Sequence, residues 1–132
     1  MKLSKKISVV VPVLNEAKVL AKFHDRLRRI LEEHVEEFEI IFVDDGSSDS
    51  TIDQLRELSR KDFRVKIISF SRNFGHPMAI SAGLDYVSGD AAIIIDADLQ
   101  DPPEILPEFL HKWQEGYKVV YGVRSKRKEW FY

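Results

Sequence analysis

The sequence predicts an α/β fold built on a mostly parallel sheet, and two observations lead to this prediction. Short β-branched segments alternate with longer segments of helical periodicity along the chain. The connections between them are short, as expected where helices carry the chain from one parallel strand to the next. With 132 residues, 44% of them hydrophobic, the chain is long enough for a single domain with a buried core.

The first part of the chain contains two predicted strands and the helix between them. Ile7–Val11 is an apolar run of strand character, which we expect Pro12 to close. In Ala17–His34, apolar side chains recur on one helical face and charged side chains lie away from it. A second apolar run, Phe38–Val43, ends at a polar loop.

The remaining elements continue this alternation. Glycine residues follow two of the predicted helices, and prolines occur in first turns, as is typical of helix ends and starts. The Ala91–Ile95 run is apolar enough to be buried on both faces of the sheet. The predicted elements are, in order, a helix from about Thr51, a strand at Val65–Phe70, a helix at Pro77–Val87, a strand at Ala91–Ile95, a helix at Pro103–Glu115 and a strand at Tyr117–Val123.

Composition excludes several classes of function. The net charge is −2, with basic and acidic residues interspersed, so the sequence does not indicate nucleic acid as a partner. The absence of cysteine excludes disulfides and thiolate metal sites and suits a reducing compartment. No apolar run approaches the roughly 20 residues that a membrane-spanning helix needs, and we expect this chain as given to be soluble.

The end of the chain differs in character from the rest. Residues 124–132 are basic and then aromatic, a combination that suits a membrane interface. We expect the natural protein to continue beyond Tyr132, which makes this chain a truncated piece. The alternative is a complete domain with a frayed terminus.

Two carboxylates follow the Ala91–Ile95 strand directly. Because alternate residues of an extended segment point the same way, Asp96 and Asp98 can face one hard cation, and Gln100 adds a neutral oxygen. The alternative is a turn with two solvated aspartates, since an isolated Asp-x-Asp is a weak motif. The position at the carboxyl end of a buried strand favours a functional site.

Polar clusters follow the other predicted strands as well. Right-handed crossovers bring the carboxyl ends of parallel strands to one rim, so these clusters are expected to converge. The chain has no P-loop and no Gly-x-Gly-x-x-Gly after its first strand. Carboxylates suit base N–H groups and ribose hydroxyls but not phosphates, so a nucleotide diphosphate would need a divalent cation. The clusters contain Asn15 and Glu16, Asp44 and Asp45, and Arg72, Asn73 and His76.

These clusters also have simpler interpretations. Asn15 and Glu16 are typical of a helix cap, and they can serve as cap and ligand together. Asp44 and Asp45, followed by Gly46, are typical of a turn. A lone histidine in a loop, such as His76, is more often solvated than catalytic.

Three segments together resemble one family. Pro12–Glu16, Val43–Asp49 and Asp96–Glu104 are similar, in order and spacing, to motifs of the family 2 inverting glycosyltransferases, in particular the polyprenyl-phosphate (dolichyl-phosphate mannosyltransferase-like) branch. The resemblance runs from about Ile7 to Arg124. It implies a GT-A (Rossmann-like) three-layer sandwich, incomplete at its C-terminus. Residues 1–123 would form the nucleotide-sugar-binding domain, and residues 124–132 would begin an acceptor or membrane-proximal region.

The resemblance assigns donor-site roles to individual residues. Pro12 and Glu16, with Asn15 beside them, would line the nucleoside pocket. Asp45 would bind the base, and Asp44 would help it or brace the loop. The family often has an aromatic residue where this chain has Leu14, so base stacking and the choice between uracil and guanine stay open.

The resemblance also implies a metal and a phosphate contact. Asp96, Asp98 and Gln100 would surround a Mg²⁺ or Mn²⁺ ion on the donor diphosphate, with Asp98 also counted as catalytic. Arg124 matches an arginine that meets phosphate in this branch and is the second catalytic candidate. Arg72, in the loop after the third strand, is a further candidate for binding the diphosphate or the acceptor.

The implied activity is sugar transfer from a UDP- or GDP-sugar to a polyprenyl phosphate at the cytoplasmic face of a membrane. A lipid phosphate is already an anion near neutral pH, so its attack on the anomeric carbon needs no strong general base, and attack opposite the leaving group inverts the configuration. A polysaccharide or other hydroxyl acceptor would need a carboxylate base. A third hypothesis is that this chain is a nucleotide-binding fragment that is inactive alone. The sequence does not decide the sugar, the metal or whether the protein forms a homo-oligomer.

Overall fold

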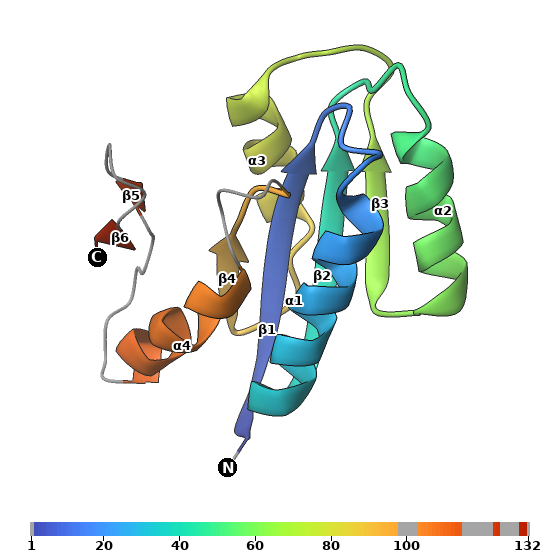
Figure 1. The fold of residues 1–132 in the computed structure, drawn as a ribbon. Helices are drawn as coiled ribbons and strands as arrows, with labels where there is room; N and C mark the ends of the chain where they lie inside the picture. The colour runs from blue at the N-terminus through green and yellow to red at the C-terminus, as the bar shows by residue number, and fades with distance from the viewer. Residues whose placement is uncertain (1, 98–102, 115–122, 125–129, 132) are drawn as a thin grey trace.

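The fold was analysed in a computed structural model, which describes residues 2–97, 103–114, 123–124 and 130–131 (Figure 1). The elements are, in order, β1 (Leu3–Val13), α1 (Leu20–His34), β2 (Val35–Asp44), α2 (Thr51–Lys61), β3 (Val65–Ser69), α3 (His76–Asp85), β4 (Ala91–Ile94), the 3₁₀ turn η1 (Pro103–Ile105), α4 (Leu106–Gln114), β5 (Val123–Arg124) and β6 (Trp130–Phe131).

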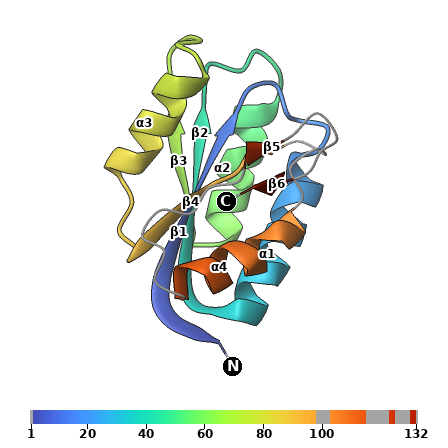
Figure 2. The same ribbon diagram turned by 90° about the vertical axis from the view of Figure 1, so that its left-hand side faces the viewer.

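A four-stranded parallel sheet organises these elements. Its strand order is β3-β2-β1-β4, so β1 pairs with β2 on one side and with β4 on the other. Helices α1, α2 and α4 cover one face and α3 covers the other, which gives three layers (Figures 1 and 2). The prediction of a mostly parallel, three-layer α/β fold is confirmed.

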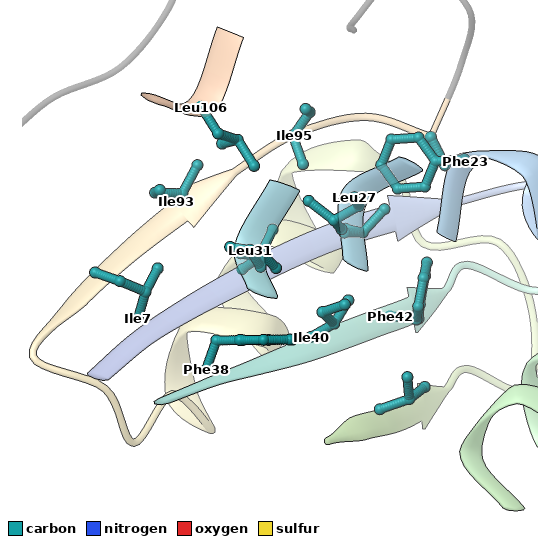
Figure 3. Packing of buried hydrophobic residues seen from close by; sticks show 14 of the residues in the cluster. Ile7, Phe23, Leu27, Leu31, Phe38, Ile40, Phe42, Ile93, Ile95 and Leu106 are labelled. Carbon is teal, nitrogen blue, oxygen red and sulfur yellow. The ribbon is translucent and has the colours of Figure 1, made fainter. Parts of the chain in front are cut away.

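Two apolar clusters hold the layers together. Residues of alternate parity along each strand point to opposite faces, and each set meets a helix layer. The face toward α1 and α4 carries the larger cluster (Figure 3), which includes Ile7, Phe23, Leu27, Leu31, Phe38, Ile40, Phe42, Ile93, Ile95 and Leu106. The face toward α3 carries a smaller one, formed by Val10, Ile41, Val43 and Ala79.

Strand β1 does not end at Pro12, as the sequence suggested, but continues to Val13. The carbonyl of Val10 accepts a hydrogen bond from the Ile95 backbone N–H, so the backbone polar groups of Val10 point toward β4. Those of Pro12, two residues later, point toward the same side. Strand β4 ends at Ile94. Beyond this end, no residue of β4 needs a hydrogen bond from position 12. Proline, which has no backbone N–H, is therefore tolerated there.

The expected burial of Ala91–Ile95 on both faces is wrong. Ile93 and Ile95 are buried against the α1 and α4 layer, whereas 41% of Ile94 is exposed. Ile94 lies opposite Val10, on the face that α3 covers. The main contacts of α3 are with β1 and β2, so Ile94 lies beside the covered area.

Other element limits differ by a few residues from the prediction. Helix α1 begins at Leu20 rather than Ala17, and the predicted helix from Pro103 starts with the 3₁₀ turn η1 before α4. Residues 117–122 of the last predicted strand lie outside the described residues. Val123 belongs to β5, which pairs antiparallel with β6. No helix in the described ranges is both long enough and apolar enough to span a bilayer.

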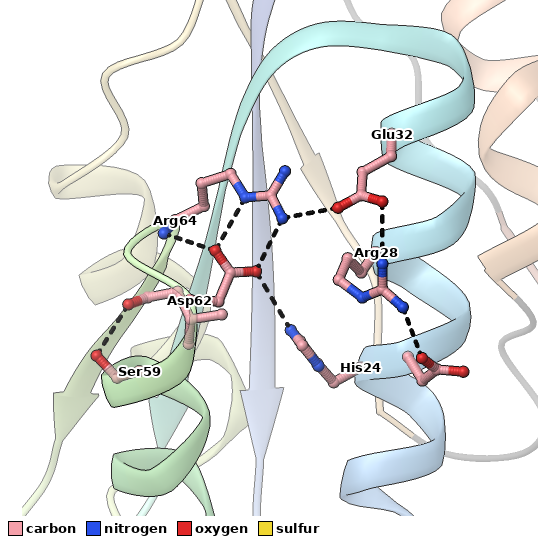
Figure 4. A network of polar contacts seen from close by, with 8 residues as sticks. His24, Arg28, Glu32, Ser59, Asp62 and Arg64 are labelled. Carbon is pink, nitrogen blue, oxygen red and sulfur yellow. Dashed lines mark hydrogen bonds and ion pairs between the residues drawn. The ribbon is translucent and has the colours of Figure 1, made fainter.

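A polar network joins α1 to the connection between α2 and β3 (Figure 4). The Arg64 guanidinium donates to Asp62 at 2.9 Å and to Glu32 of α1 at 2.8 Å. His24 is buried, with its Nε2 atom 3.8 Å from an Asp62 carboxylate oxygen. Burial lowers the pKa of His24, and this effect outweighs the nearby Asp62 carboxylate, which raises it.

A second buried network lies at the middle of β1 and β2. Glu39 accepts hydrogen bonds from the Ser8 hydroxyl at 2.6 Å, the Ser88 backbone N–H at 2.7 Å and the Lys66 ammonium at 2.8 Å. Burial alone raises the pKa of Glu39, but these hydrogen bonds outweigh it and lower the pKa to about 2. Glu39 thereby ties β2 to β1, to β3 and to the connection between α3 and β4.

Replacement of this carboxylate should change the pH dependence of stability. Because the pKa of Glu39 falls from 4.5 unfolded to about 2 folded, its contribution is complete above pH 4.5 and is lost as the pH falls to 2. Lys66 is half-exposed, so solvent screens its ion pair with Glu39 and reduces this contribution. We therefore expect Glu39→Gln to lower the unfolding free energy at pH 7 by about 2 to 3 kcal/mol. Urea titrations at pH 7, 4 and 2.5 measure the unfolding free energy of the wild type and the variant.

The neighbouring Glu37→Gln variant is the matched control. Glu37 is largely exposed and forms only a 3.9 Å ion pair with Lys6, so its removal should change stability little. The role assigned to Glu39 is wrong if both variants lose the same amount, or if the loss for Glu39→Gln is as large at pH 2.5 as at pH 7.

Candidate donor-binding site

The described residues form a pocket of about 260 Å³ at the carboxyl ends of β1, β2 and β4. The carboxyl edge of a parallel sheet is where ligands bind in open α/β folds. The predicted site residues Pro12, Glu16, Asp45 and Asp96 all line this pocket. The complete lining is Pro12, Val13, Leu14, Glu16, Asp45, Asn73, Gly75, His76, Ala79 and Asp96.

Asp45 fixes the loop between β3 and α3. Its side chain is buried, with 4% of the residue exposed. One carboxylate oxygen accepts from the Phe74 backbone N–H at 2.8 Å, and the other accepts from the Gly75 N–H at 3.1 Å. The Asp45 N–H donates to the Val13 carbonyl at 2.9 Å, which holds the residue beside the end of β1.

Gly46 allows this loop to approach closely. Its φ is +79°, a left-handed value that favours glycine. A Cβ atom added there would lie 2.4 Å from the Arg72 carbonyl carbon and 2.6 Å from the Asn73 nitrogen. The backbone of the β3–α3 loop therefore packs directly on Gly46, next to Asp45.

Asn15 and Asp44 brace the loops rather than line the pocket. The Asn15 side-chain oxygen accepts from the Ser48 backbone N–H at 2.8 Å, and Asn15 itself adopts a φ of +53°. One Asp44 oxygen accepts from the Ser47 N–H at 3.1 Å. Of the two roles considered for Asp44, this contact matches the bracing one. Side-chain capping of α1 by Asn15 is not observed, because the helix begins later, with Val19 as its N-cap residue.

Asp96 and His76 are in contact at the pocket wall. Asp96 follows β4, and His76 is the first residue of α3. The His76 Nε2 atom lies 2.8 Å from an Asp96 carboxylate oxygen, and the two side chains are 55% and 40% exposed. His76 is half-exposed, as expected for a loop histidine, but it also has a specific partner among the candidate site residues.

The remaining candidates lie apart from the pocket or outside the described residues. The Arg72 guanidinium stacks 4.2 Å above the centre of the Phe74 ring, and Arg72 is not part of the pocket lining. Asp98 and Gln100 lie outside the described residues. Arg124 belongs to β5, where the backbone is described.

Asp96 is the candidate cation ligand that lies among the described residues. Asp96 offers carboxylate oxygens, which suit Mg²⁺ and Mn²⁺. In the ranges that the structure describes, no group of three or more His, Cys, Asp or Glu residues lies close enough to hold a metal ion. The assignment of Asp96, Asp98 and Gln100 as cation ligands stays a prediction.

Sequence reasoning missed two pocket residues, Gly75 and Ala79. Both are small and lie in the first turn of α3 or just before it, and Gly75 adopts a φ of +104°. A glycine immediately before a His-Pro helix start is the signal that could have indicated a turn with positive φ here.

The sequence and the fold match a known enzyme family. Residues 8–130 match the model of glycosyl transferase family 2, and the chain therefore belongs to this family. Its fold is that of the GT-A glycosyltransferases, of which the chain covers a part. The structure of a mannosyltransferase from Pyrobaculum calidifontis in complex with GDP-Man and Mn²⁺ superposes with a TM-score of 0.66 at 22% identity, over 73% of this chain and 28% of that one.

Curated relatives are similar over nearly all of this chain. The uncharacterized glycosyltransferase YkcC of Bacillus subtilis is 56% identical over 121 residues, which covers 92% of this chain and 38% of the relative. The bactoprenol glucosyl transferase of Shigella phage SfV is 46% identical over 137 residues, which covers 96% of this chain and 45% of the relative. The chain thus spans less than half the length of these relatives.

Replacement of Gly46 should disturb the site through Asp45. In Gly46→Ala, the added carbon meets the Arg72 and Asn73 backbone, which should push the β3–α3 loop away from Asp45. We expect an unfolding free energy lower by about 2 to 4 kcal/mol, from backbone strain and overpacking together, and weaker nucleotide binding. Thermal unfolding and calorimetric titration measure the two effects.

Gly75→Ala provides the comparison for this experiment. Its φ of +104° makes alanine strained there too, but the nearest atom to an added Cβ is 3.8 Å away. If Gly46→Ala and Gly75→Ala lose equal stability, the close approach at Gly46 contributes nothing and backbone strain accounts for both.

Proposed function

We propose that this chain is the donor-binding part of a metal-dependent inverting glycosyltransferase, which transfers a sugar from a UDP- or GDP-sugar to a polyprenyl phosphate. The observation that carries the proposal is the pocket at the carboxyl edge of the sheet. It gathers Pro12, Glu16, Asp45 and Asp96 from the carboxyl ends of three separate strands and the loops that follow them. Membership of glycosyl transferase family 2 supports a sugar-transfer reaction at this pocket.

The nucleotide end of the donor is assigned to the side of the pocket formed by β1 and β2. Asp45 is buried and keeps acceptor oxygens at the pocket wall, which suits a base N–H. Pro12 and Glu16 would complete the nucleoside pocket, with Leu14 against the base. Asn15 and Asp44 would contribute by holding the loops in place, as their hydrogen bonds to Ser48 and Ser47 indicate.

The diphosphate end is assigned to the side formed by β4. Asp96 would hold a Mg²⁺ or Mn²⁺ ion together with Asp98 and Gln100. When bound, the cation would supply Lewis-acid stabilisation of the negative charge on the departing nucleotide diphosphate. The related mannosyltransferase that was solved with GDP-Man and Mn²⁺ supports a nucleotide sugar and a cation as ligands.

The acceptor is assigned as a polyprenyl phosphate because a relative at 46% identity is a bactoprenol glucosyl transferase. The phosphate oxygen attacks the anomeric carbon, and the bond from that carbon to the nucleotide diphosphate breaks. Attack from the opposite side inverts the configuration. The nucleophile is already an anion at neutral pH, so the residues need to orient it rather than deprotonate it.

Orientation of the acceptor is assigned to Arg124 and to the residues that follow it. An arginine suits a phosphate because it donates two parallel hydrogen bonds. In this assignment residues 1–123 form the donor domain, and residues 124–132 begin an acceptor or membrane-proximal region. Their basic and aromatic composition supports contact with the cytoplasmic surface of a membrane, where further parts of the full-length protein would anchor it. Arg72 is a second candidate for the acceptor phosphate.

Calorimetric titration tests the donor site. UDP and GDP are titrated into the protein with and without Mn²⁺, for the wild type, Asp98→Ala and the surface control Asp53→Ala. We expect one nucleotide to bind only with Mn²⁺, and this binding to weaken at least about tenfold in Asp98→Ala because a cation ligand is lost. Asp53 lies on α2 in an exposed pair with Arg56, so its variant should bind like the wild type.

Two results would overturn the donor-site assignment. One is the absence of binding by the wild type at millimolar nucleotide with Mn²⁺ present. The other is equal binding with and without the cation, unchanged in Asp98→Ala.

Transfer assays with the full-length protein test the acceptor. Radiolabelled sugar should appear on a polyprenyl phosphate and not on the matching polyprenol, because the phosphate supplies the anionic nucleophile. Equal labelling of the alcohol, or labelling of a polysaccharide alone, would contradict the proposed acceptor and leave the donor site standing.

A further inference from the structure

The loop from β3 to α3 connects the two ends of the candidate site. Asp45 follows β2 and Asp96 follows β4, and β1 lies between these strands in the sheet. The loop crosses this gap, because its Phe74 and Gly75 N–H groups donate to Asp45 and the next residue, His76, contacts Asp96. A continuous set of contacts thus joins the buried carboxylate to the more exposed one.

The contact places one ring nitrogen of His76 within hydrogen-bond distance of Asp96. An ionised carboxylate only accepts hydrogen bonds, so the 2.8 Å contact with such a carboxylate requires the form of His76 that carries a proton on Nε2. With a proton on Nε2, that nitrogen has no lone pair to give to a cation. In this arrangement His76 is a partner of Asp96 rather than a cation ligand.

The contact contributes little to stability by itself. Both side chains are about half-exposed, and polar pairs in such positions stabilise a fold only weakly. What the contact determines is the direction of the Asp96 carboxylate, which lies two residues beyond the last residue of β4 and lines the pocket beside His76. Carboxylates that hold cations are commonly oriented in this way by a neighbouring donor.

We propose that His76 is a positioning residue, whose Nε2–H holds the Asp96 carboxylate in the orientation that a divalent cation on the nucleotide requires. The proposal rests on the proposed function, since it needs the cation at Asp96. It assigns a function to the first residue of α3. The loop held by Asp45 and Gly46 determines where this residue begins the helix.

The test compares the Mn²⁺ concentration that half-saturates nucleotide binding in the full-length wild type, His76→Ala, His76→Gln and Asp96→Asn. We expect His76→Ala to require about 10- to 100-fold more Mn²⁺, the usual effect of removing such a partner. Its melting temperature should match that of the wild type, and at saturating Mn²⁺ its nucleotide affinity should approach that of the wild type. His76→Gln should recover most of the affinity, because the glutamine amide can present an N–H at a similar reach.

His34→Ala is the matched control, since it removes a histidine at the end of α1, away from the pocket lining, and should leave the Mn²⁺ requirement unchanged. If His76→Ala binds Mn²⁺ like the wild type while Asp96→Asn does not, the positioning role is overturned and the proposed function stands. If His76→Gln is as weak as His76→Ala, the positioning role is also overturned, because an imidazole lone pair is then what the cation needs. If the wild type shows no Mn²⁺ dependence, the proposed function itself fails.

Discussion

Strand β1 forms parallel ladders with β2 along one side and with β4 along the other, and the positions of the candidate residues depend on this pairing. Because the strands share one direction, their carboxyl ends meet at one edge of the sheet. Pro12, Asp45 and Asp96 lie at or just beyond the carboxyl ends of three different strands and line one pocket for this reason. The apolar clusters on both faces of the sheet keep the strands in this register.

The β3–α3 loop supplies backbone N–H donors to the candidate site. Asp45 could have been a solvated turn residue, but its oxygens accept the Phe74 and Gly75 N–H groups, and Gly46 lets the loop backbone lie against it. The same loop delivers His76 to Asp96. One buried carboxylate therefore organises a loop that reaches across the width of β1.

The sequence was informative where periodicity and strand ends decide the structure. The alternation of apolar runs predicted the parallel sheet and the convergence of Glu16, Asp45 and Asp96, because both follow from local pattern and the handedness of crossovers. It could not reveal that Pro12 lies within β1, since this depends on where the neighbouring strand ends. The contact between His76 and Asp96 was equally hidden, because it depends on how α3 is placed relative to β4.

The alternation of β4 has a further consequence for how this chain can change during evolution. Ile93 and Ile95 face the apolar layer of α1 and α4, and Asp96, of opposite parity, meets His76 of α3. Insertion or deletion of one residue between Ala91 and Ile95 would exchange these faces and turn the carboxylate toward the apolar core. Natural length variation in this strand should therefore occur in steps of two residues, whereas the loops around it can vary by one.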